Sequence, residues 1–285
     1  MLWGRDDSHT GRVENINQQK PIPLSSVGFD NPEAKEAAIE RYYLNEIDRQ
    51  AEIAALNINS AVMAGCRTRN PHDPLVWSAL QSMMFSTICI LRLLDPRSVY
   101  DAYPGMSKSA SLRHAKARGK RLRELLEIGD DSFILKVDAV RNAFEHYDEH
   151  IDSRFVGGAY SLTDWYITDG HAFKTPPKFG AQPAGAVGMR VFFPAGGMLY
   201  FDDEELDLFE LELDLLEIRR LIPLKLEELS AQFKGMRALF GGHHAVVLMS
   251  AEHVQYRFNE WQRLRSEALQ AAPQMELVAI PAPGE

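Results

Sequence analysis

Residues 132–152 carry the most regular apolar repeat in the chain. Its members lie three or four residues apart: Phe133, Val137, Val140, Phe144, Tyr147 and Ile151. An α-helix has about 3.6 residues per turn, so this spacing places all six side chains on one face. Asp130 and Asp131 precede the repeat, where acceptors and negative charge stabilise a first turn. We therefore expect one helix over residues 131–154, with its apolar face packed against other helices.

Proline-containing caps predict two helices earlier in the chain. Asn31-Pro32 has the form of an N-cap followed by proline, and a helix is expected over residues 32–65. Asp73-Pro74 repeats this signal before residues 75–94, which are apolar on almost every face. A helix of that kind is normally the central member of a bundle or part of an interface between subunits.

A third helix is expected over residues 109–128, so four helices follow one another. This order predicts a helical bundle over residues 31–154. Residues 1–30 are polar and contain several proline and glycine breaks, and we expect them to form a mobile N-terminal segment.

The composition changes after residue 154. Aromatic and β-branched residues around a Pro-Ala-Gly-Gly turn predict a β-hairpin or small sheet, and helical patterns resume at 214–240 and 251–270. Pro223 predicts a kink or a boundary in the first of these helices. The expected fold is mainly α, and α+β overall: a bundle followed at 155–272 by a small antiparallel β extension and C-terminal helices, with a tail at 273–285.

The composition limits the classes of function. The net charge is −9, so any binding to nucleic acid or to an anionic membrane must be local. The two cysteines, Cys66 and Cys89, lie in apolar stretches, and we expect buried thiols rather than disulfides or metal ligands. No run of residues has the form of a signal peptide or a strong membrane span. We expect a cytoplasmic protein that needs no membrane, metal or cofactor.

The predicted helix at 131–154 also carries a short polar motif. Arg141 is followed by Asn142 and, four residues later, by His146. This arrangement resembles the RxxxxH motif of the HEPN (higher eukaryotes and prokaryotes nucleotide-binding) family, which lies on a late helix of a four- or five-helix bundle. The resemblance covers roughly residues 32–154 and implies an HEPN-like bundle.

The resemblance implies a metal-independent endoribonuclease, or an inactive nucleotide-binding relative. Family members commonly build their site where two copies meet, so a homodimer is expected, with an antitoxin-like protein as a further candidate partner. Histidine titrates near neutral pH and can move a proton, whereas arginine can clamp a phosphate. Arg141, Asn142 and His146 are therefore the predicted catalytic residues, acting on RNA phosphodiesters.

Basic residues are concentrated in the third predicted helix. Seven occur between residues 108 and 123, with no acidic residue before Glu124. We predict that five of them guide an RNA strand: Arg113, Lys116, Arg118, Lys120 and Arg121. The alternative is a solvated helix face without a ligand.

Other interpretations of the motif stay open. Arg141 and Glu145 have the spacing of a helical ion pair, so the polar face can be purely structural, as in a protein-interaction or nucleotide-binding bundle without activity. Residues 146–150 also read HxxEH, similar to the zinc-peptidase signature of the inverzincins, in which both histidines bind zinc and a glutamate acts as base.

Overall fold

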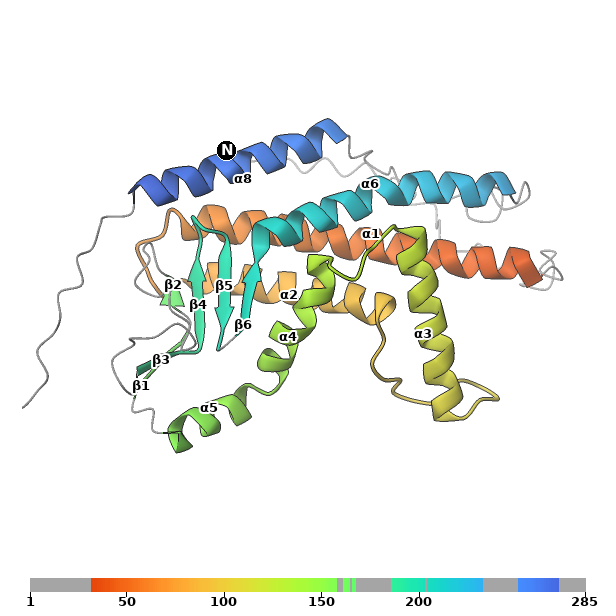
Figure 1. Cartoon of the computed structure of the whole chain (residues 1–285), viewed down its shortest axis with the longest axis horizontal. Coiled ribbons are helices and arrows are strands. Elements are labelled where there is room, and N and C mark those ends of the chain that lie inside the picture. Colours follow the sequence, from red (N-terminus) through yellow and green to blue (C-terminus); the bar gives the residue numbers. More distant parts are fainter. Residues whose placement is uncertain are drawn as a thin grey trace, which may run out of the picture.

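A computed structural model describes residues 32–157, 161–164, 166–167, 186–202, 204–232 and 251–271. Within them it is mainly helical, with a small sheet at one end (Figure 1). The predicted mobile segment at 1–30 and the predicted tail at 273–285 lie outside the described residues. The expected fold class, mainly α with a small β portion, is confirmed.

Helices α1 (Pro32–Gly65) and α2 (Pro74–Leu94) form a hairpin at the centre of the molecule. The Asp73 side chain accepts a hydrogen bond from the backbone N–H of Leu75, 3.0 Å away, and so caps α2 as predicted. Helix α2 has a mean hydropathy of 1.5 over its most apolar stretch, which is high enough for a membrane span, but half of that stretch is buried inside the protein. Because α2 packs against α1, α3 and α4, its position in the core accounts for this hydropathy.

Helix α3 (Lys108–Leu125) packs against α2 at a glycine. A Cβ atom at Gly119 would lie 2.5 Å from the carbonyl oxygen of Leu94 and 2.9 Å from Cδ of Pro96. Only a residue without a side chain permits this approach between the basic helix and the end of α2.

The single helix predicted over residues 131–154 is wrong, because it breaks at His146. Helix α4 is Phe133–Glu145 and helix α5 is Tyr147–Val156, and His146 between them has φ −110° and ψ 31°. The predicted cap is also different. Asp130 pairs with Arg123 at 3.1 Å, and the start of α4 is held instead by Asp214, which accepts from the Ser132 hydroxyl at 2.5 Å.

The sheet has the strand order β2-β4-β5-β6: Tyr166–Ile167, Arg190–Phe193, Met198–Phe201 and Glu204–Asp207. The antiparallel pairs β4–β5 and β5–β6 confirm the predicted hairpin. In contrast, β2 joins parallel to β4, and β1 (Ser161–Thr163) pairs parallel with β3 (Ala186–Gly188). Strand β6 leads directly into α6.

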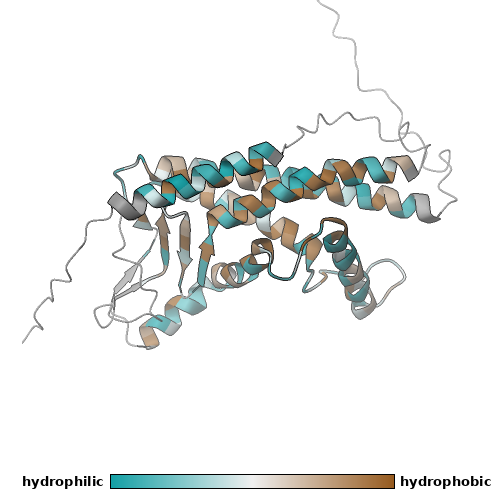
Figure 2. Cartoon of the chain, turned by 45° about the horizontal axis from the view of Figure 1, so that its top comes forward, coloured by the Kyte–Doolittle hydropathy of each residue, from teal (hydrophilic) through white to brown (hydrophobic). Residues whose placement is uncertain are grey.

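Helix α6 (Leu208–Gln232) continues through Pro223 and packs along α1, and α8 (Ala251–Ala271) packs on α6. Figure 2 shows the strands and α2 as mainly hydrophobic, whereas α8 is mainly hydrophilic. One hydrophobic core includes residues of α1, α2, α4, the sheet, α6 and α8. Residues on both sides of the predicted boundary at 154 therefore share the same core.

Candidate functional site

Buried apolar residues fix the orientation of α4. Ile134, Val137, Val140 and Ala143 are all buried, and α4 packs against α2, α6 and the sheet. The predicted apolar face is thus confirmed at Val137 and Val140, while Phe133, Phe144, Tyr147 and Ile151 are half-buried at its margins. The polar residues of α4 lie to either side of this packed face.

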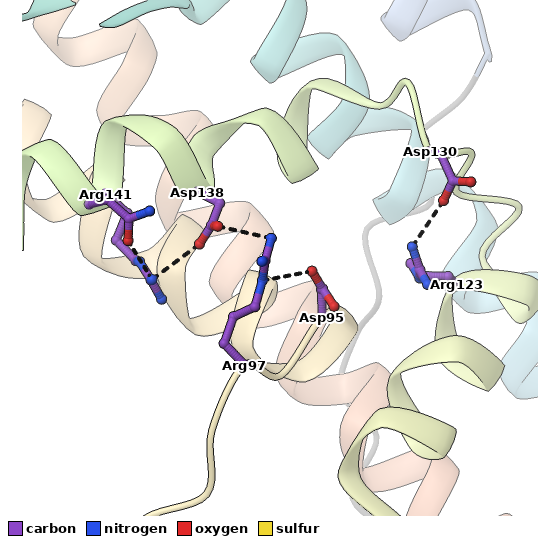
Figure 3. Close-up of polar contacts among 7 residues, drawn as sticks. Asp95, Arg97, Arg123, Asp130, Asp138 and Arg141 are labelled. Carbon is purple, nitrogen blue, oxygen red and sulfur yellow. Dashed lines mark hydrogen bonds and ion pairs between the residues drawn. The ribbon is translucent and has the colours of Figure 1, made fainter. Parts of the chain in front are cut away.

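Arg141 belongs to a chain of ion pairs that joins α4 to the end of α2 (Figure 3). Its Nη2 lies 3.2 Å from Oδ1 of Asp138, and the other oxygen of Asp138 lies 3.0 Å from Arg97. Arg97 also pairs with Asp95, the C-cap of α2, at 3.2 Å. Arg141 donates a further hydrogen bond to the Asn142 side chain at 2.7 Å. The structure therefore brings Arg141 and Asn142 together and anchors both to α2.

His146 is exposed at the break between α4 and α5. Its Nδ1 lies 3.2 Å from Oε1 of Glu149, one turn further along the chain. A carboxylate in this position fixes the orientation of an imidazole ring. The imidazole ring of His146 therefore contacts the Glu149 side chain.

The break at His146 directs the side chains of α5 toward the sheet. The buried carboxylate of Asp202 lies 2.6 Å from Nδ1 of His150 and 2.6 Å from Nη2 of Arg154. The hydroxyl of Tyr147 donates to Asp164 at 2.5 Å, and burial together with this bond raises the pKa of Tyr147 to about 12. A tyrosine with so high a pKa stays protonated at neutral pH and is excluded as the general base beside His146.

Among the described residues, the two histidines of the HxxEH string contact different carboxylates. His146 pairs with Glu149, whereas His150 pairs with Asp202. In the part of the chain that the structure describes, no group of three or more His, Cys, Asp or Glu side chains is placed to hold a metal ion. The zinc-peptidase interpretation gains no support from these positions.

The five predicted RNA-binding residues of α3 fall into two groups. Arg113, Lys116 and Lys120 are exposed, and Lys120 lies 3.7 Å from Glu124. Arg121 instead pairs with Glu36 and Glu40 of α1, and Arg118 lies over the ring of Tyr43, 4.8 Å from its centre. The first group is open to a ligand, whereas the second connects α3 to α1.

A pocket of about 390 Å³ lies where α1 and α3 meet. It is lined by charged and aromatic side chains as well as apolar ones: Lys35, Glu36, Ile39, Tyr43, His114, Ala117, Arg118 and Arg121. Burial raises the pKa of Glu40 beside this pocket, and the charge of Arg121 opposes that effect. Cations next to an aromatic ring can bind the phosphate and the base of a nucleotide. In this pocket, however, the carboxylates of α1 already neutralise part of the positive charge of the arginines.

Several interacting residues were not predicted from the sequence. Asp202 lies about 50 positions from His150 and Arg154, so no local spacing indicates these pairs. Glu212 could have been identified from the sequence as a buried acidic residue, because it lies on the apolar face of α6 between Phe209 and Leu215. The prediction that Cys66 is a buried thiol is wrong, since α1 ends at Gly65 and Cys66 is exposed in the following loop.

Comparison with protein-family models, with curated proteins and with solved structures found no match.

Proposed function

We propose that the protein is a metal-independent endoribonuclease of the HEPN type that acts as a homodimer in the cytoplasm. The observation that carries this proposal is the placement of His146. It is an exposed histidine at a helix break, with a carboxylate 3.2 Å from Nδ1, and it lies five residues after Arg141. The Arg141–Asn142 pair occupies the last part of the same helix.

This placement suits His146 to proton transfer. With Glu149 accepting from the protonated Nδ1, Nε2 is the proton acceptor. Nε2 takes the proton of a ribose 2′-hydroxyl, and the 2′-oxygen attacks the adjacent phosphorus. The bond from phosphorus to the 5′-oxygen breaks, leaving a 2′,3′-cyclic phosphate and a 5′-hydroxyl, and the equivalent histidine of a second copy donates the proton to that oxygen.

Arg141 offsets the charge that develops on the phosphate. Its guanidinium group is held by Asp138 and Asn142, so its orientation is fixed before a ligand arrives. Arg113, Lys116 and Lys120 on α3 supply positive charge that attracts the strand.

Cleavage of an end-labelled RNA in the presence of EDTA tests this proposal. The wild-type protein should give products ending in a 2′,3′-cyclic phosphate, and His146→Ala should reduce the rate by about 100-fold or more, the usual contribution of a general base. His253→Ala is the matched control, because His253 is an exposed histidine on α8. Cleavage unaffected by His146→Ala would reject His146 as the base.

A site that uses a histidine from each of two copies requires the protein to be a dimer. Light scattering should give twice the mass of one chain, and mixtures of His146→Ala with wild-type protein should lose activity beyond simple dilution. A fully active monomer would contradict the dimeric site while leaving the role of His146 open to the first experiment.

A second candidate is a non-catalytic nucleotide-binding or protein-interaction bundle. The ion pairs from Asp95 to Arg141 favour it, because they give Arg141 a structural role in joining α2 to α4. In that case the wild-type protein would not cleave RNA under any of these conditions, and Arg141→Ala would change only stability.

A further inference from the structure

A pocket away from α4 lies at the loop between α1 and α2. Its volume is about 530 Å³, within the range of small-molecule sites. It is lined by the end of α1, the following loop, β2 and the β4–β5 turn: Gly65, Cys66, Thr68, Arg69, Asn70, Pro71, Tyr166, Ile167, Pro194 and Ala195. We call this site the loop pocket.

Close packing holds two walls of the loop pocket together. A Cβ atom at Gly65 would lie 2.7 Å from Cγ of Pro194, so the end of α1 directly contacts the β4–β5 turn. On another side, the backbone N–H of Ile167 donates to the carbonyl oxygen of Pro71 at 2.7 Å, which attaches β2 to the loop. These contacts define the shape of the pocket before any ligand binds.

Hydrogen bonds within the loop fix its polar wall. The Thr68 hydroxyl donates to Asp73 at 2.8 Å, and the Asn70 side chain accepts from the backbone N–H of His72 at 3.0 Å. The Thr68 hydroxyl and the backbone N–H of Leu75 both donate to the carboxylate of Asp73, and these hydrogen bonds lower its pKa. The nearest acidic side chain of the loop is therefore directed to the loop and to the cap of α2, and it does not line the pocket.

The charge of the loop pocket contrasts with that of the whole chain. Among its described lining residues Arg69 is the one charged side chain at neutral pH, in a protein with net charge −9. The structure gives Arg69 no ion pair with any residue it describes. The pKa of the neighbouring Cys66 thiol is raised, because the thiol is partly desolvated although the residue is exposed overall, so Cys66 is neutral. The remaining wall offers the ring of Tyr166 and the apolar surfaces of Ile167 and Pro194.

We propose that the loop pocket binds a small organic anion with a planar body. Arg69 pairs with the phosphate or carboxylate group, since a guanidinium can donate two parallel hydrogen bonds to either. Tyr166, Ile167 and Pro194 contact the planar part, and Asn70 provides a neutral donor and acceptor for its edge. This site is separate from His146 and does not depend on the proposed ribonuclease activity.

The thiol of Cys66 provides a direct assay. Cys89→Ser leaves Cys66 as the single cysteine of the chain, and its alkylation by iodoacetamide can be followed by mass spectrometry. Two probes are compared, adenosine monophosphate for a phosphate head and benzoate for a carboxylate head. At about ten times its dissociation constant, a probe that binds should slow alkylation about tenfold, because the thiol reacts only in the free protein.

Two neighbouring arginines supply the matched pair of variants. Arg69→Ala should weaken protection of Cys66 about tenfold or more, because it removes a charge-assisted hydrogen bond. Arg67→Ala should leave the affinity unchanged, since Arg67 is also exposed in the loop but does not line the pocket. Circular dichroism of both variants verifies that they fold.

The proposal is overturned if neither probe slows alkylation, or if the two arginine variants weaken protection equally. Protection by adenosine monophosphate alone identifies a phosphate ligand, and protection by benzoate alone identifies a carboxylate ligand. Either result supports the site, and neither depends on whether the protein cleaves RNA.

Discussion

Arg141 on α4 and Arg121 on α3 are both predicted to contact RNA, and each lies beside carboxylates, but their surroundings differ. The Arg141 side chain is 14% exposed, and its partner Asp138 is 15% exposed. The Arg121 side chain is 43% exposed and pairs with Glu36, which is 54% exposed, and with Glu40, which is 13% exposed. A buried ion pair cannot lose one member without leaving a charge in poor solvent, whereas an exposed pair is readily replaced by water. We therefore expect the two arginines to contribute differently to the stability of the fold, although nothing in the sequence distinguishes them.

The largest expected effect concerns this difference directly. Arg141→Ala should lower the free energy of unfolding by roughly 3 kcal/mol, the low end for a buried ion pair, because Asp138 loses one of its two partners in a mostly buried position and keeps Arg97. Arg121→Ala should cost less, because Arg121 is 43% exposed and one of its two partners, Glu36, is exposed as well. Urea denaturation of both variants measures the difference. Equal losses would show that burial does not separate the two arginines.

A third arginine, Arg257, pairs with a carboxylate that is still more buried than Asp138. Nη2 of Arg257 on α8 lies 3.0 Å from Oε1 of Glu212 on α6, and burial raises the pKa of Glu212 to about 7, although Arg257 opposes this shift. The folded protein therefore binds a proton at Glu212 that the unfolded chain releases nearer pH 4.5. Stability from this group is complete below about pH 4.5 and is lost as the pH rises to about 7, by about 3 kcal/mol in total.

Denaturation between pH 5 and pH 8 measures this effect. Glu212→Gln should remove the Glu212 part of the pH dependence while keeping the shape of the side chain. Glu210→Gln is the control, because Glu210 lies on the same helix and is only half-buried. Identical pH profiles for wild type and Glu212→Gln would contradict the raised pKa.

The smallest effect is expected on α3, at the exposed residues Arg113 and Lys116. If both contact phosphates of a single strand, the double variant Arg113→Ala/Lys116→Ala should reduce the slope of log affinity against log salt by about 1.4. Fluorescence anisotropy with a labelled oligoribonucleotide measures this slope. The thermal stability should not change, because neither side chain has an ion-pair partner among the described residues. An unchanged slope would place RNA elsewhere on the molecule.

The helices could be predicted well because their signals are local. The proline caps before α1 and α2 and the apolar repeat of α4 each lie within a few turns of the helix they define. The break at His146 could not be predicted, since no proline or glycine marks it. The contacts that accompany it come from Asp164 and Asp202, which lie at least 17 residues from their partners in α5.

The candidate site shows the same limit. The residue types at 141, 142 and 146 could be identified from the sequence, but their partners could not be. Asp138 lies one turn before Arg141, but the extent of its burial depends on the packing of α4 against α2. The role of Arg118 and Arg121 in joining α3 to α1 depends on residues 75 to 85 positions away.

The glycine at position 119 has a consequence for how such a protein can change over time. Helix α3 contacts the end of α2 through the backbone at Gly119. The position of all the basic side chains of α3 therefore depends on a residue that has no Cβ atom. Charged residues on the outer side of α3 can be exchanged freely without disturbing the bundle, whereas any larger residue at 119 would displace all of them together. The exposed surface of α3 can thus diversify while its place on the scaffold stays the same.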